Sequence, residues 1–145
     1  MSPSLIFQIA NGVTLLSWLV LILSPNQLKV IRLLRFFISG FILGGVYIFL
    51  ILIGSGEAEG NFSSLESVRS LFANDYVLLA GWIHYLAFDL FLGTWEVEDG
   101  SKVGMNRWIL VPILALTFYF GPAGFVLYLI LRFLKGFVFK KEKVT

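Results

Sequence analysis

The residues best suited to chemistry lie in one apolar stretch, residues 81–95, whose sequence is GWIHYLAFDLFLGTW. It holds the single histidine of the chain, His84, together with Asp89, and Tyr85 precedes Asp89 by four residues. In a helix this spacing places the phenol and the carboxylate on one face, whereas His84 lies about 140° from Asp89 around the helix axis. A histidine, a carboxylate and a phenol held away from water are suited to general acid–base catalysis.

An ionisable side chain inside an apolar span is costly to bury, so it marks a functional site by default. We therefore predict catalytic roles for His84, Asp89 and Tyr85. The alternative is that Asp89 and His84 only join neighbouring helices. In a second alternative Asp89 reaches water near a membrane surface, because Glu96 follows it by only seven residues.

Further polar and aromatic residues are candidates for contact with a ligand. Asn11 and Trp18 are seven residues apart and share one helical face. Because lipid offers an amide no partner, this face is expected to point into a helical bundle. The residues predicted to contact a ligand are Asn11, Trp18, Trp82, Phe88, Trp95, Tyr119, Tyr128 and Arg132. The alternatives are a hydrogen bond between helices for Asn11 and simple anchoring at the membrane surface for Arg132.

Four apolar stretches must position these residues, at about 5–23, 33–53, 76–92 and 108–134. Each is close to or longer than the roughly 20 residues that a helix needs to cross a bilayer. The chain of 145 residues is 58% hydrophobic and only 14% charged, whereas a soluble domain carries about 25% charged residues. The sequence therefore predicts an all-α integral membrane bundle of four transmembrane helices, forming a single domain over residues 1–145, and argues against a soluble enzyme.

The connections carry signals of their own. Residues 24–27 predict a tight turn, and residues 96–107 a polar connection with two glycines. Ser63, followed three residues later by Glu66, is typical of a helix start, so a short helix at the membrane surface is predicted over 64–73, with a solvated loop as the alternative. Gly121 and Pro122 predict a kink in the fourth helix, and residues 135–145 form a basic tail.

The basic residues do not orient this arrangement. Four spans place both termini on one side. The loops and the C-terminal tail then carry five Lys and Arg residues on one side of the membrane and six on the other. Such a balance leaves the orientation open. Because these charges flank apolar segments, they do not indicate nucleic-acid binding. With one histidine and no cysteine, no metal site is predicted, and no cofactor is expected.

Together these motifs resemble a known family, the small four-helix membrane proteins related to plant neoxanthin synthase of the abscisic-acid-deficiency type. The resemblance rests on Asn11, Trp18 and Pro25, on the stretch 81–95, and on Gly121, Pro122 and Gly124 with Tyr128 and Arg132. It spans most of the chain. The first apolar stretch begins almost at once, without a plastid transit peptide, so we expect a bacterial inner membrane, or the plasma or thylakoid membrane of a cyanobacterium.

The resemblance implies a carotenoid isomerase that opens an epoxide to an allenic alcohol, acting on a carotenoid or a related isoprenoid lipid. The 24 aromatic residues of the chain suit a rigid polyene. One alternative is a membrane subunit that binds pigment or lipid without catalysis. A small proton-coupled transporter using Asp89 is another, and it would need more helices, which a homo-oligomer could supply.

Overall fold

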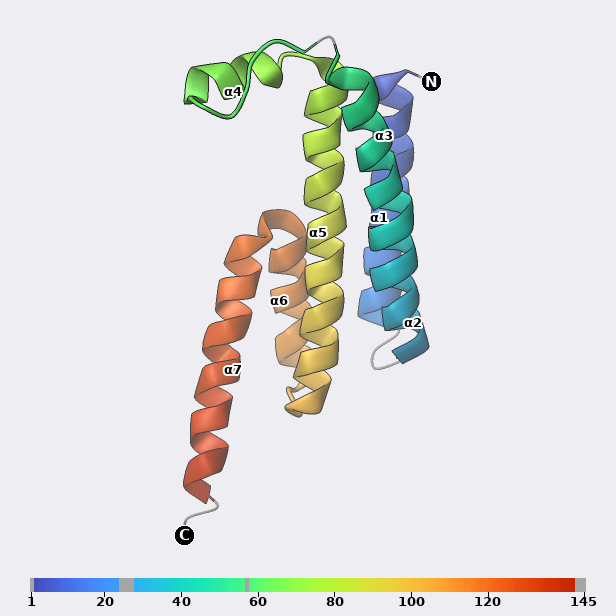
Figure 1. The fold of residues 1–145 in the computed structure, drawn as a ribbon. Helices are drawn as coiled ribbons and strands as arrows, with labels where there is room; N and C mark the ends of the chain where they lie inside the picture. The colour runs from blue at the N-terminus through green and yellow to red at the C-terminus, as the bar shows by residue number, and fades with distance from the viewer. Residues whose placement is uncertain (1, 24–27, 57, 143–145) are drawn as a thin grey trace.

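The computed structural model describes residues 2–23, 28–56 and 58–142 and is helical throughout its ordered elements (Figure 1). Three long helical runs lie side by side. The first is α1 (Pro3–Leu23), the second joins α2 (Leu28–Arg32), η1 (Leu33–Leu43) and α3 (Gly44–Gly54), and the third is α5 (Asp75–Lys102). These three runs are long and apolar enough to cross a membrane. The membrane bundle predicted from the composition is therefore supported.

The second run contains an unusual segment, η1, in which the helix widens to π geometry. The Gly44 amide at its end donates to the Ser39 carbonyl, five residues earlier, which is the π pattern. Ser39 is buried, and its hydroxyl donates to the Ala87 carbonyl of α5 at 2.7 Å. The segment is thus fixed against α5 by a side chain that points inward.

The fourth apolar stretch is two helices, which corrects the prediction of a single kinked span. α6 (Arg107–Phe120) ends at Gly121, whose φ of +31° is open to glycine, and α7 (Pro122–Glu142) begins directly after it. Proline suits a first helical position because no backbone N–H is needed there. With 14 residues, α6 is about 21 Å long, too short to cross a hydrocarbon core of about 30 Å.

The two helices form a hairpin that enters the bundle and turns back (Figure 1). Gly121 lies against Asp89, near the middle of α5. Further along α7, the Tyr128 hydroxyl donates to Asp99, and Lys135 donates to the Gly104 carbonyl just beyond the end of α5. α7 therefore returns to the end of the bundle from which α6 started.

This hairpin changes the topology. α1 begins and α7 ends at opposite ends of the bundle (Figure 1), so the expectation that both termini share one side is wrong. It also redistributes the charges. Among the residues whose side chains the structure describes, seven basic residues lie on elements at the end where α5 finishes, namely Lys29, Arg32, Arg35, Lys102, Arg107, Arg132 and Lys135. At the other end of the bundle, the one basic residue in the described part of the chain is Arg69.

Two connections differ from the sequence-based prediction and one agrees with it. The predicted helix near 64–73 is confirmed as α4 (Leu65–Leu71), although its cap is Ser64 rather than Ser63. The predicted end of the third span is wrong, because α5 continues for ten residues beyond 92 and only Val103–Asn106 connects it to α6. α7 also extends into the predicted basic tail, through Glu142. The turn predicted at 24–27 lies outside the described residues.

Candidate functional site

One face of α5 carries a row of polar and aromatic side chains directed towards the hairpin. Trp82, Tyr85, Asp89 and Glu96 follow one another at intervals of three, four and seven residues, which keeps them on one helical face. Asp89 lies 14 residues after the start of α5 and 13 before its end. The carboxylate is therefore near the middle of the span, where water is scarce.

Asp89 occupies the space beside the turn of the hairpin. A Cβ atom at Gly121 would lie 2.5 Å from Asp89 Oδ1 and 3.1 Å from Oδ2, so only glycine leaves room for the carboxylate. Asp89 is 8% exposed, and its Oδ2 is buried without a hydrogen-bond partner among the described residues. An unpartnered buried carboxylate oxygen is an acceptor available to a ligand or a proton.

Tyr85 joins α5 to the same turn. Its hydroxyl lies 3.2 Å from both the Phe118 and the Tyr119 carbonyl and donates to this pair. These carbonyls belong to the last turn of α6, where the helix leaves acceptors without an internal donor. The phenol therefore satisfies the broken end of a helix at membrane depth, one turn of α5 away from Asp89.

A groove of about 400 Å³ opens next to Tyr85. Among its lining residues are Asn11, Thr14, Trp82, Tyr85, Phe118 and Tyr119. We call it the lipid-facing groove, because its rim includes the half-exposed rings of Trp82 and Tyr119. Asn11 is fixed by the Trp82 indole N–H, which donates to its side-chain oxygen at 2.9 Å. The buried Thr14 hydroxyl has no partner among the described residues.

His84 and Phe88 lie elsewhere. They line a second, apolar groove of about 290 Å³ between α5 and the run of η1 and α3. The His84 ring contacts Phe88 at 4.5 Å and Tyr47 at 5.8 Å between centroids. The structure thus brings Asp89 and Tyr85 to one side of α5 and leaves His84 on another, in keeping with their angular separation around the helix.

Trp18 is part of the packing beneath the lipid-facing groove. It is 2% exposed, and its ring stands edge-on to Phe118 at 5.5 Å between centroids. A Cβ atom at Gly93 would overlap this indole, so Gly93 allows α1 to approach α5 closely. Trp18 therefore supports the α6 end of the groove and does not line it.

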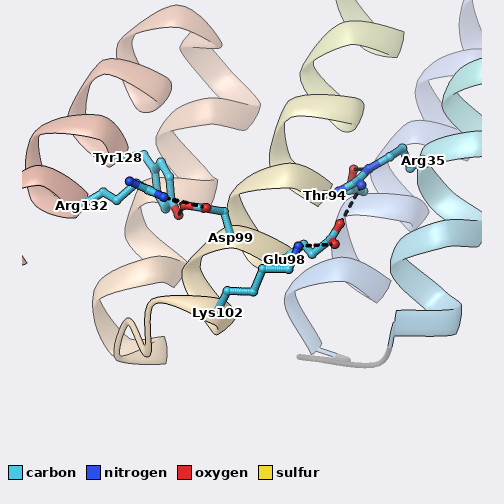
Figure 2. A network of polar contacts seen from close by, with 7 residues as sticks. All are labelled: Arg35, Thr94, Glu98, Asp99, Lys102, Tyr128 and Arg132. Carbon is cyan, nitrogen blue, oxygen red and sulfur yellow. Dashed lines mark hydrogen bonds and ion pairs between the residues drawn. The ribbon is translucent and has the colours of Figure 1, made fainter. Parts of the chain in front are cut away.

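Two further predicted residues, Tyr128 and Arg132, lie near the end of α5 (Figure 2). The Tyr128 hydroxyl donates to Asp99 Oδ2 at 2.6 Å, and the Arg132 guanidinium donates to both Asp99 carboxylate oxygens. Trp95 stands edge-on to Tyr128 and Phe125, with centroid distances of 5.5 and 5.7 Å. Tyr128 is fully buried. These residues fasten α7 to α5, well away from Asp89.

A second set of polar contacts fastens α5 to η1 on the opposite side (Figure 2). Arg35 donates to Glu98 Oε2 at 2.7 Å and to Thr94 Oγ1 at 3.1 Å. Glu98 also accepts from Lys102 at 2.7 Å. The Arg35 and Glu98 side chains are 12% and 24% exposed, so this pair is largely shielded from solvent. Glu98 and Asp99 near the end of α5 are therefore each paired with basic side chains, Glu98 on the side of η1 and Asp99 on the side of α7.

A further acid of α5, Glu96, is fully buried against the Thr117 hydroxyl of α6. In the part of the chain that the structure describes, no group of three or more His, Cys, Asp or Glu side chains could hold a metal ion. Glu96 thus meets a hydroxyl group, whereas Glu98 and Asp99 pair with basic side chains.

The arrangement of these motifs agrees with a family comparison. The model of the ABA DEFICIENT 4-like family matches residues 5–128, which cover α1 to the first part of α7. The chain belongs to this family. Comparison with curated proteins and with solved structures gives no match. The apolar helices are those of a membrane protein.

In this ABA DEFICIENT 4-like chain the structure places several residues at the candidate site that the sequence did not single out. Thr14 follows Asn11 by three residues, so helical spacing could have placed it on the same face. Glu96 continues the row of Tyr85 and Asp89, but it falls in a segment predicted as a connection. The spacing of residues in the sequence does not mark Thr117 or Phe118, because only the reversal at Gly121 brings them against α5.

Proposed function

We propose that this protein binds the end of a carotenoid or related isoprenoid lipid in the lipid-facing groove and isomerises an epoxide there by general acid–base chemistry. The observation that carries this proposal is the buried Asp89 carboxylate, whose Oδ2 is without a partner among the described residues. It lies one helical turn from a phenol that lines an apolar groove. The resemblance to the neoxanthin-synthase-like family supports the choice of substrate.

The groove suits one end of a long apolar molecule. Its volume of about 400 Å³ lies in the lower part of the ~300–1,000 Å³ range of small-molecule sites. The rest of a polyene would remain in the bilayer, next to the exposed apolar surface of the helices. Asn11 and Thr14 supply the few polar groups that orient a ligand in an otherwise apolar site.

The proposed isomerisation needs one base and one acid. Asp89 takes the vinylic proton next to the epoxide, the electron pair of that C–H bond forms the second double bond of an allene, and the neighbouring C–O bond of the epoxide breaks. The Tyr85 phenol gives its proton to the departing oxygen, which becomes a tertiary alcohol. The proton on Asp89 then returns to Tyr85, so that atoms and charge balance without a co-reactant.

A specific observation favours a second candidate, binding without catalysis. The Tyr85 hydroxyl already donates to the Phe118 and Tyr119 carbonyls, so it must leave these acceptors before it can protonate a substrate. If it stays, the groove still binds an apolar ligand through its aromatic rings, with Thr14 as the free hydroxyl. The two candidates therefore differ in what Tyr85 and Asp89 contribute.

Expression in a violaxanthin-producing host, followed by pigment chromatography, distinguishes them. We expect the unchanged protein to yield a new pigment of the same mass. Asp89→Asn and Tyr85→Phe each lower its yield by about 10²–10⁴-fold, the contribution of a general acid or base. Glu66→Gln in α4 and Tyr76→Phe at the start of α5 are the matched controls for the same chemical changes away from the groove, and we expect both to retain full yield.

Pigment conversion and pigment binding can be told apart. A polyene that co-purifies with the protein in mild detergent, with an unchanged pigment profile, would establish the binding function and overturn catalysis. If neither a new pigment nor a bound polyene is found while the protein is present in the membrane, both candidates fail.

A further inference from the structure

We propose that Glu96 is a neutral carboxylic acid that positions the α6–α7 turn, and through that turn the Asp89 carboxylate. The inference deepens the proposed function, because Asp89 is its central residue. It concerns a buried acid to which the proposed reaction assigns no step.

The surroundings of Glu96 are those of an uncharged acid. Its side chain is fully buried, and none of the ion pairs among the described residues includes it. An isolated ionised carboxylate is far more costly to bury than a neutral one. Three basic side chains near this end of α5 pair instead with Glu98 and Asp99, namely Arg35, Lys102 and Arg132.

The hydrogen bonds of Thr117 point the same way. Its hydroxyl lies 3.1 and 3.0 Å from the two oxygens of Glu96 and 3.1 Å from the Ile113 carbonyl. A hydroxyl has one hydrogen to donate and two lone pairs to accept, so it cannot donate to a carboxylate and a carbonyl at once. The contacts of the Thr117 hydroxyl are compatible when Glu96 donates its acid proton to Thr117 Oγ1 and Thr117 donates its own hydrogen to the Ile113 carbonyl.

Thr117 connects Glu96 to the turn. Its carbonyl accepts the backbone N–H of Gly121 at 2.8 Å, and Gly121 is the residue against which Asp89 lies. On the other side, a Cβ atom at Gly124 would overlap Thr117, so the start of α7 packs directly on the same residue. A hydrogen bond from Glu96 to Thr117 therefore fixes the depth at which the hairpin turns beside Asp89.

Three variants test this role. Glu96→Gln keeps a donor of the same shape, and we expect its hairpin geometry and pigment yield to stay within about twofold of the unchanged protein. Glu96→Leu and Thr117→Val remove the hydrogen bond while keeping similar bulk. We expect about a tenfold to hundredfold loss of turnover in both, the scale of a misplacement of about 1 Å, with little change in the substrate concentration for half-maximal rate.

Two measurements need no substrate and so stand apart from the proposed function. The infrared spectrum of the purified protein should contain the carbonyl band of a neutral carboxylic acid that disappears in Glu96→Gln. Because the chain has no cysteine, spin labels at Ser101→Cys on α5 and Val126→Cys on α7 report the hairpin position. The distance distribution between them should broaden in Thr117→Val and Glu96→Leu but not in Glu96→Gln.

Each outcome decides the inference. If the infrared spectrum of Glu96→Gln has lost none of the absorption of neutral carboxylic acids, Glu96 is not a neutral acid. If Thr117→Val leaves the distance distribution unchanged, the hydrogen bond does not position the turn. If both structural results hold and no pigment is converted by any variant or by the unchanged protein, Glu96 positions the turn and the proposed reaction is what fails.

Discussion

Gly121 is the residue at which the fold and the candidate site depend on each other, and Gly121→Ala tests that dependence. Its φ of +31° and ψ of −88° lie in a region that residues with a Cβ rarely adopt, at a cost of about 1–2 kcal/mol. The new methyl group would also lie 2.5 Å from Asp89 Oδ1 and 3.1 Å from Cγ. Overpacking of this kind costs about 1–3 kcal/mol.

The two effects together predict that Gly121→Ala lowers the free energy of unfolding by about 2–5 kcal/mol. Gly45→Ala is the matched control, because a Cβ atom at Gly45 meets nothing within 4 Å. In the interior of α3 this change should be neutral or stabilise by about 0.5–1 kcal/mol, since alanine favours the helix. The same methyl group is therefore expected to act in opposite directions at the two positions.

Thermal unfolding in mild detergent measures the difference. At about 2–4 °C per kcal/mol for a chain of this size, the midpoint of Gly121→Ala should fall by roughly 4–20 °C, whereas that of Gly45→Ala should not fall. Equal midpoints for the two variants would refute the reversal at Gly121 and the contact with Asp89. A single kinked helix, in which residue 121 keeps helical dihedral angles, would give that result.

Three further changes test other parts of the structure. Seven of the eight Lys and Arg residues whose side chains the structure describes lie on elements at the end where α5 finishes, so the positive-inside rule predicts that this end faces the cytoplasm. A membrane-impermeant maleimide should therefore label Ser63→Cys in intact cells and Ser101→Cys only after lysis, and the reverse pattern would contradict this orientation. Gly93→Ala should destabilise the protein by about 1–3 kcal/mol in the same thermal assay, because its methyl group overlaps the Trp18 indole; an unchanged midpoint would argue against that packing. Asp99→Asn should lower the midpoint, since removing one partner of a partly buried charge pair leaves the Arg132 charge uncompensated, whereas Glu66→Gln, on an exposed residue of α4, should leave it unchanged.

Helical periodicity made much of the bundle predictable. Long apolar runs located the crossing helices, and the spacing of Tyr85 and Asp89 correctly placed them on one face and His84 on another. A Ser and Glu signature located α4 to within one residue of its observed cap. These features depend on residues close together in the sequence, so a single chain is enough to show them.

The hairpin could not be read in the same way. Gly121 and Pro122 show that a helix is interrupted, but a kink and a reversal begin with the same residues. The reversal depends on partners far away in the sequence, namely Asp89 beside Gly121 and Asp99 beside Tyr128. The number of crossing helices depends on whether the chain kinks or reverses at Gly121. A kink instead of a reversal therefore predicts the wrong side for the C-terminus and the wrong distribution of basic residues between the two ends of the bundle.

The length of α5 was misjudged for a related reason. Glu96, Glu98 and Asp99 make the end of α5 polar, and hydropathy counts each side chain as if it stood alone. In the fold each acid has a partner that offsets the cost of its burial. Thr117 hydrogen-bonds Glu96, and Arg35 and Lys102 pair with Glu98. Tyr128 and Arg132 donate to Asp99. A polar stripe with partners on neighbouring helices continues a helix just as well as an apolar one.

The yield of isomerised pigment from Asp89→Asn, compared with the unchanged protein in a violaxanthin-producing host, tests the central claim most directly. We expect a new pigment of unchanged mass from the unchanged protein and its loss by at least about a hundredfold in Asp89→Asn, with both proteins present in the membrane at equal levels. Full conversion by Asp89→Asn would contradict the claim that the buried carboxylate beside the hairpin turn is the base of the reaction.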